Sequence, residues 1–287
     1  MDARALRQHL TAMSARDATR FLSTLSERKL RELEFHDRDR AASSQERETG
    51  ARYRNRKYYS VTRASQEYVD EWLARAVPGR VFLDYACGSG RRVIQAAKAG
   101  STLAVGIDIS DVSLDLGRGR AEQEGVADRC CFVQADCEET GLPDGCVDVV
   151  LCSGMLHHLD LSYAFPELRR ILRAGGRILG VEALNYNPAL RLYRKLTPGM
   201  RTEWEAEHIL SLKDLELARR FFDVRDVRFW HLSSLLATPF RRRERVFHAV
   251  LAPLERVDAL LARVPGVRLM SWQFTFELVK RPEAGRA

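Results

Sequence analysis

Apolar and polar residues follow two rhythms along the chain, and from Val81 onward the two alternate. Short apolar runs have the length of strands, whereas longer segments repeat apolar residues at helical spacing. A first predicted strand begins at Val81 and runs into Asp84, and the others cover 103–108, 130–136, 146–154, 177–182, 221–230 and 272–279. Predicted helices cover 111–124, 161–173 and 212–220, and another follows Gly90. Seven strands with intervening helices predict an α/β fold with a doubly wound, mostly parallel sheet.

The segments outside this alternation predict helical additions to the sheet. Helical spacing predicts two helices within residues 1–34, with a break near 14–17, and another helix over 65–76. Residues 36–56 are dense in charge and poor in aliphatic side chains, which predicts a mobile or partly ordered segment. We therefore divide the chain into an N-terminal helical extension and lid (1–79), a core (80–182), a substrate-cap insertion (183–210) and a C-terminal half of the sheet (211–287) with a helical insertion at 231–269.

The stretch from Val81 to Gly90, VFLDYACGSG, joins a strand to a helix through a glycine turn. Gly88 and Gly90 have no Cβ, which lets the backbone bend sharply or approach a ligand closely. A phosphate-binding loop would end in Gly-Lys-Ser/Thr and a dinucleotide fingerprint would read G-x-G-x-x-G, and the stretch has neither. An acidic residue followed by small residues and glycines resembles motif I of the class I S-adenosylmethionine (SAM)-dependent methyltransferases, with Ala86 in place of the usual first glycine.

This resemblance implies a Rossmann-like methyltransferase fold, with SAM as the cofactor and S-adenosylhomocysteine as its product. Asp84 would face the positively charged methionine end of SAM. Asp108, about 20 residues after the turn, would accept both ribose hydroxyls, or else cap the following helix. Asp136 would accept the adenine amine beside the backbone N–H of Cys137, or else be an ordinary loop aspartate. The expected cofactor-binding residues are Asp84, Ala86, Gly88, Gly90, Asp108, Ile109, Asp136, Cys137, Ser153, Tyr58 and Tyr59.

Tyr58 and Tyr59, upstream of the core, have two interpretations. Their aromatic faces could close over the methionine end of the cofactor, because such faces attract a sulfonium cation and exclude water. Packing of the N-terminal helix on the sheet explains the pair equally well.

The run CSGMLHHLD over 152–160 follows the fourth predicted strand, where acceptors meet SAM in the family that this chain resembles. Its Gly-x-Leu-His-His-Leu form resembles the small-molecule branch of that family, and it lacks the Asp/Asn-Pro-Pro-Tyr run of adenine methylases of nucleic acids. His157 or His158 could take a proton from an acceptor; alternatively, one packs against a helix and the other borders the cofactor. Glu182 and His208 are expected to form a polar wall for the acceptor. The histidine pair lacks further ligands, so we predict no metal site.

Composition narrows the choice of partners. The net charge of +7 is spread over arginines along the chain, which permits an anionic partner without requiring one. Six cysteines without a CxxC pair argue against a disulfide framework and a zinc site. The sequence has neither a signal-peptide pattern nor a long apolar run, which predicts a cytoplasmic protein. Residues 241–264 have one broad apolar face, which could pack on the sheet, contact another subunit in a homo-oligomer or lie on an anionic membrane.

We therefore expect a SAM-dependent methyltransferase that methylates oxygen, nitrogen or carbon of a small molecule by in-line displacement. Natural products, sugars and lipid- or quinone-like compounds are the acceptor classes that the resemblance implies, and no specific nucleic acid is expected as a partner. Two rivals stay open, namely a nucleic-acid methyltransferase and a non-catalytic SAM-binding module.

Overall fold

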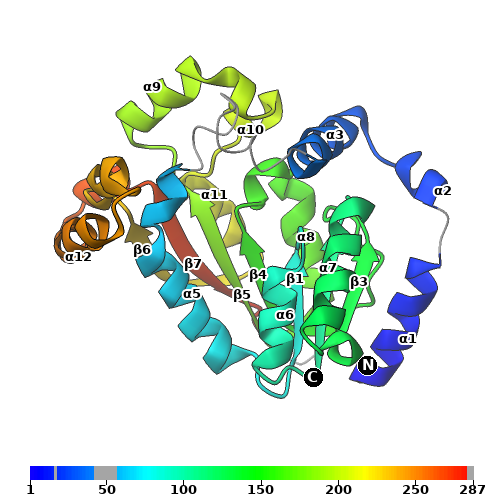
Figure 1. The fold of residues 1–287 in the computed structure, drawn as a ribbon. Helices are drawn as coiled ribbons and strands as arrows, with labels where there is room; N and C mark the ends of the chain where they lie inside the picture. Colours follow the sequence, from blue (N-terminus) through cyan, green and yellow to red (C-terminus); the bar gives the residue numbers. More distant parts are fainter. Residues whose placement is uncertain (16–17, 42–56, 283–287) are drawn as a thin grey trace.

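A computed structural model describes residues 1–15, 18–41 and 57–282 of the chain. Its centre is a seven-stranded sheet in the order β3-β2-β1-β4-β5-β7-β6 (Figure 1). The strands are β1 (Val81–Tyr85), β2 (Leu103–Asp108), β3 (Cys130–Gln134), β4 (Val147–Ser153), β5 (Leu172–Ala183), β6 (Asp223–Trp230) and β7 (Gln273–Val279). Only β7 is antiparallel to its neighbours, which confirms the predicted, mostly parallel sheet.

Helices cover both faces of the sheet, because successive strand residues point to opposite sides. In β1, for example, Phe82 packs with α5, α6 and α7, whereas Leu83 packs with α1, α8 and α11. The helices are α1 (Ala3–Ser14), α2 (Ala18–Leu22), α3 (Glu27–Ala41), α5 (Arg63–Ala76), α6 (Arg91–Lys98), α7 (Asp111–Gln123), α8 (Leu161–Ile171), α9 (Pro188–Leu196), α10 (Glu203–Glu207), α11 (Leu212–Ala218) and α12 (Glu244–Leu261). The arrangement is therefore doubly wound, as the sequence predicts.

The N-terminal segment differs from its prediction. Three helices, α1, α2 and α3, occupy the part of the chain where two were expected, and α3 continues to Ala41. Of the segment 36–56, which was expected to be mobile or partly ordered, residues 36–41 form the last part of α3, where the hydroxyl of Ser110 donates a hydrogen bond to Asp37. The rest of that segment, 42–56, lies outside the described residues.

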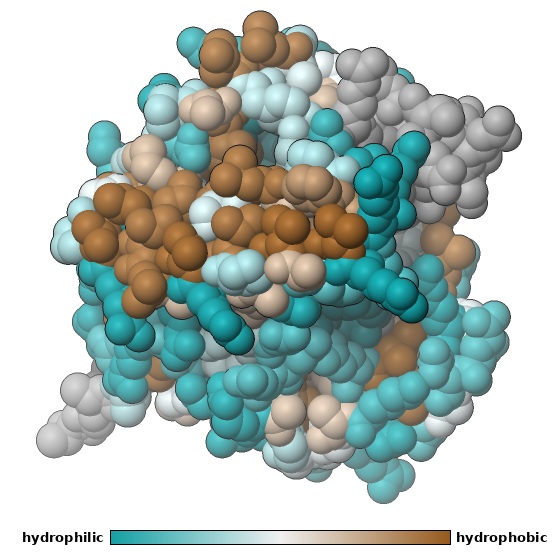
Figure 2. Space-filling view, turned by 60° about the vertical axis from the view of Figure 1, so that its left-hand side comes forward, coloured by the Kyte–Doolittle hydropathy of each residue, from teal (hydrophilic) through white to brown (hydrophobic). Residues whose placement is uncertain are grey.

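The two insertions fold as helices beside the sheet. Residues 183–210 contain α9 and α10, and residues 231–269 contain α12 and the short 3₁₀ segment Ser234–Phe240. The apolar residues of α12 divide between two surroundings: Phe247 and Leu251 are buried, whereas a second set remains exposed. That exposed set is Val246, Val257 and Leu260, and it continues with Val264 after α12, Leu236 and Phe240 of the 3₁₀ segment, and Leu192 and Leu196 of α9. Figure 2 shows a broad hydrophobic surface on this side of the molecule.

Among the described helices, none combines the length and the apolar character that crossing a bilayer requires.

Candidate cofactor and acceptor site

The turn between β1 and α6 is built from left-handed backbone. Ala86, Gly88 and Gly90 have φ angles of +61°, +50° and +74°. Glycine adopts this region at no steric cost, whereas an L-residue such as Ala86 pays about 1–2 kcal/mol. A Cβ on Gly90 would also lie 2.5 Å from Cε1 of Phe132. The glycine turn predicted from the sequence is present, and Ala86 is its strained position.

Asp108 connects this turn to the end of β2. Its Oδ2 accepts a hydrogen bond from the N–H of Gly88 at 2.8 Å, and its Oδ1 accepts one from the N–H of Ser110 at 2.9 Å. The carboxylate is nearly buried and faces the pocket at the carboxyl ends of the strands. Both the turn and the start of α7 are therefore held by the residue predicted to bind ribose.

Asp136 follows β3 and is held from two sides. Its Oδ1 accepts from the N–H of Glu138 at 2.9 Å, and its Oδ2 lies 2.5 Å from Nζ of Lys29 on α3. Lys29 also lies 2.7 Å from Oε2 of Glu138. Lys29 therefore contacts the same oxygen of Asp136 that was expected to accept a hydrogen bond from the adenine amine. The neighbouring Cys137 has a thiol whose pKa burial raises well above its ordinary value, so the thiol stays protonated.

These elements enclose one pocket, bounded by strand ends on one side and α3 on the other. Of the predicted site residues, the pocket is lined by Ala86, Asp108, Ile109, Asp136, Cys137, Ser153 and His158. Its polar wall has acceptor-only carboxylates beside a close-packed turn, which suits a ligand with hydroxyl and amino groups. The chemistry of the pocket therefore fits a nucleoside-containing cofactor such as SAM.

Helix α3 supplies the part of the wall that the sequence did not reveal. Arg28, Lys29, Glu32, Leu33 and His36 line the pocket, and they recur at spacings of three and four residues. That spacing marks one face of a helix. Four of its five residues are polar or charged, so the spacing of apolar residues does not reveal this face.

Asp84 is deeply buried and is not among the described residues that line the pocket. Burial raises the pKa of its carboxyl to about 7, an effect that Arg92 opposes and Asp108 reinforces. Its predicted contact with the methionine end of SAM remains a prediction.

The histidine pair after β4 divides between two carboxylates. His157 is nearly buried and its Nδ1 lies 2.6 Å from Oε2 of Glu182, whose Oε1 accepts the N–H groups of Met155 and Leu156. His158 lines the pocket instead, and its Nδ1 lies 2.9 Å from Oε2 of Glu32. Glu182 therefore fixes the loop after β4, and only His158 of the pair is among the described pocket-lining residues.

Three further predicted residues lie away from the described wall of this pocket. Tyr58 and Tyr59 make edge-to-face contacts with Trp272, and the side chain of Tyr59 is 56% exposed. His208 stacks on Trp204 of α10 with 3.6 Å between the ring centroids. Their predicted contacts with the cofactor or the acceptor remain predictions.

Comparison with known proteins places this site in a family. Residues 83–180 match the family described as a methyltransferase domain, and they include the turn, both strand-end carboxylates and the loop after β4. Residues 83–180 are a SAM-dependent methyltransferase domain. The match begins within β1 and ends within β5. Helices α3, α9, α10 and α12 therefore lie outside it.

Curated relatives of this methyltransferase domain include enzymes with different acceptors. A ubiquinone/menaquinone biosynthesis C-methyltransferase of Acidiphilium cryptum is 36% identical over 121 residues, which are 41% of this chain and 49% of the relative. A ribosomal protein L11 methyltransferase of Pasteurella multocida is 32% identical over 115 residues, 40% of this chain and 37% of the relative. The chain thus spans half or less of the length of these relatives.

Solved structures agree on the fold. A geranyl diphosphate C-methyltransferase from Streptomyces coelicolor A3(2), in complex with Mg²⁺, geranyl diphosphate and S-adenosyl-L-homocysteine, superposes with a TM-score of 0.55 and 18% identity. The superposition covers 81% of this chain and 85% of that one.

Proposed function

We propose that this chain transfers the methyl group of SAM to an oxygen, nitrogen or carbon atom of a small-molecule acceptor. The observation that carries the proposal is the pocket at the strand ends, whose lining includes Ala86 of the turn, Asp108, Asp136 and His158. Bound SAM would supply an electrophilic methyl group, and its sulfonium sulfur would keep the electron pair as the acceptor atom attacks in line. The residues of the chain would align the two partners and exclude water.

Cofactor binding is assigned to individual groups of the chain. Asp108 and Asp136 would accept hydrogen bonds from the ribose hydroxyls and the adenine amine, and the turn at Ala86 would leave room for the methionine part. Ile109, Cys137 and Ser153 would complete the wall, because they line the same pocket. Use of Asp136 by adenine would require Lys29 to release the carboxylate oxygen that it now contacts.

The acceptor is proposed to be a small molecule, such as a natural product, a sugar or a quinone- or lipid-like compound. Similarity to quinone-forming C-methyltransferases and the Leu-His-His-Leu run support this choice. Contact of residues 241–264 with a membrane, contact between subunits and a cytoplasmic location stay predictions. The exposed apolar residues of α12 are compatible with either contact.

Calorimetric titration with SAM and with S-adenosylhomocysteine tests the cofactor assignment. Asp108→Ala should weaken SAM binding by about 2–4 kcal/mol, the worth of paired hydrogen bonds to a charged group. Asp115→Ala is the matched control, because Asp115 lies exposed on α7 and should leave the affinity unchanged. Equal SAM affinity of wild type and Asp108→Ala would refute the ribose assignment.

Turnover is tested separately with radiolabelled SAM and panels of phenols, sugars and quinones. Transfer of label to one of these classes is expected. Binding of SAM without transfer to any of them, but with transfer to nucleic acid or a ribosomal protein, would refute the small-molecule proposal. Binding without transfer to any acceptor would favour the non-catalytic module.

A further inference from the structure

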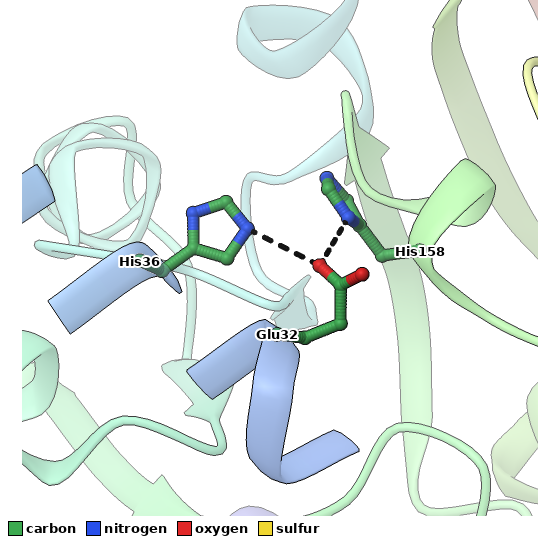
Figure 3. Close-up of side chains that lie close together, drawn as sticks. All are labelled: Glu32, His36 and His158. Atoms are coloured by element: carbon green, nitrogen blue, oxygen red, sulfur yellow. Dashed lines mark hydrogen bonds and ion pairs between the residues drawn. The ribbon is translucent and has the colours of Figure 1, made fainter. Parts of the chain in front are cut away.

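The pocket wall contains a cluster of side chains that the cofactor assignment does not use. Glu32 and His36 extend from α3, and His158 extends from the loop after β4 (Figure 3). One oxygen of Glu32, Oε2, lies 2.9 Å from Nδ1 of His158 and 3.7 Å from Nε2 of His36. Their donor atoms all lie within 4.8 Å of one another.

We propose that Glu32, His36 and His158 form a binding site for one divalent transition-metal ion of the Zn²⁺ class. Two imidazoles and one carboxylate are a donor set that Zn²⁺, Fe²⁺ and Co²⁺ accept, and three protein ligands leave a coordination position open. The sequence predicted no such site, because Glu32 and His36 lie more than 100 residues before His158.

The spacing of the donor atoms suits such an ion. Zn²⁺ holds nitrogen and oxygen ligands at about 2.0–2.2 Å, so neighbouring ligands of a tetrahedral ion are about 3.4 Å apart. The two separations from Oε2 of Glu32 bracket this value. Side-chain shifts of well under 1 Å at those two contacts would therefore admit the ion.

The carboxylate is held in place before any ion arrives. Glu32 is almost fully buried, and its second oxygen, Oε1, accepts a hydrogen bond from the hydroxyl of Thr202. Such outer contacts orient a ligand and reduce the cost of ordering it. The i, i+4 spacing of Glu32 and His36 presents both groups on one side of α3, as in helical metal motifs generally.

The cluster lies where an ion could enter from solvent and where its open coordination position would face the pocket. All three residues line the cofactor pocket, and the side chain of His36 is 38% exposed. The open coordination position could thus take water or an oxygen of a ligand in the pocket. This assignment gives His158 a role as a metal ligand and replaces its predicted role as a base.

The competing interpretation is a hydrogen-bonded cluster that only fastens α3 to the loop. Both interpretations use the contact between Glu32 and His158, but only a metal site needs His36. His36→Ala therefore separates them.

The test is titration of chelator-treated protein with Zn²⁺ by calorimetry and with Co²⁺ by visible absorption. We expect one ion per chain, and a loss of affinity of at least about 100-fold in His36→Ala and in Glu32→Gln, since loss of an outer contact alone costs about 10–100-fold. His248→Ala is the matched control, because His248 is an exposed histidine on α12. An unchanged far-UV circular dichroism spectrum and an unchanged urea midpoint would show that the variants are folded.

Several results would overturn the proposal. One is equal metal affinity in wild type and His36→Ala, which would place the ion elsewhere. Another is a Co²⁺ spectrum dominated by thiolate bands, which would assign the ion to cysteines. A response to Mg²⁺ alone would contradict the donor set, because Mg²⁺ prefers oxygen ligands in octahedral geometry.

Discussion

Replacing the buried Asp84 by asparagine should change how stability depends on pH. Burial raises the pKa of this carboxyl from 3.8 to about 7, a shift of about three units. At about 1.4 kcal/mol per unit, the shift corresponds to about 4 kcal/mol. Asparagine has nearly the same shape as the protonated acid and carries no charge at any of these pH values.

The free energy of unfolding changes with pH because Asp84 holds its proton differently in the folded and the unfolded chain. Below about pH 4 the carboxyl is protonated in both the folded and the unfolded chain, so its shifted pKa does not lower the free energy of unfolding. As the pH rises from 4 toward 7, the unfolded chain loses this proton while the folded chain keeps it, and the free energy of unfolding falls. Above about pH 7 the loss is complete. Asp84→Asn removes this one contribution and leaves the other titrating groups in place.

The assay is urea unfolding of wild type and Asp84→Asn at pH 5 and at pH 8. The free energy of unfolding of the variant, relative to wild type, should rise by about 2.5 kcal/mol between these pH values. Asp115→Asn, on the exposed surface of α7, should show no such rise. A parallel pH dependence of Asp84→Asn and wild type would refute the buried, protonated state.

Other changes test the turn and the α3 wall. Ala86→Gly should raise the free energy of unfolding by about 1 kcal/mol, because glycine relieves the left-handed strain at this position. Gly90→Ala should lower it by about 2–5 kcal/mol in urea unfolding, since its Cβ meets the ring of Phe132 and its φ is positive. Lys29→Met should lower the dissociation constant of SAM severalfold in calorimetry, because it releases the Asp136 carboxylate for adenine.

Matched variants keep these tests specific. Gly125→Ala also places alanine at a positive φ, but its Cβ has nothing within 4 Å, so it should cost only about 1–2 kcal/mol. Lys98→Met removes an exposed lysine that pairs with Glu124 and should not alter SAM affinity. A gain in affinity from both lysine variants would point to general charge and contradict the specific role of Lys29. An unchanged stability of Ala86→Gly would contradict the strain argument.

Local sequence patterns predicted the sheet and its turn because their determinants are short-range. Apolar runs of strand length, each ending in an acidic residue, placed Asp84, Asp108 and Asp136 at the carboxyl ends of strands, where the structure has them. Helix ends were less exact. The helix expected to reach residue 173 ends at Ile171, because the chain pairs with β4 from Leu172 onward. That pairing depends on a distant strand and leaves little local trace.

The α3 wall could not be predicted for a different physical reason. Its contacts join residues 28–32 to residues 136–158 through charges and hydrogen bonds, which leave no trace in the spacing of apolar residues. Hydrophobic patterning reports which side of a helix is apolar, whereas this helix uses a polar side. The same reasoning explains the separate roles of His157 and His158, which depend on carboxylates far along the chain, Glu182 and Glu32.

The ionic attachment of α3 has a kinetic consequence for the exchange of ligands. One wall of the pocket is held by the pairs of Arg28 with Glu138 and Lys29 with Asp136, whose side chains are only 8–20% exposed. Dissolved ions screen pairs that are this far buried much less than they screen pairs on an open surface. The residence time of a bound ligand should therefore depend little on ionic strength, because the α3 wall stays attached at salt concentrations that separate surface ion pairs.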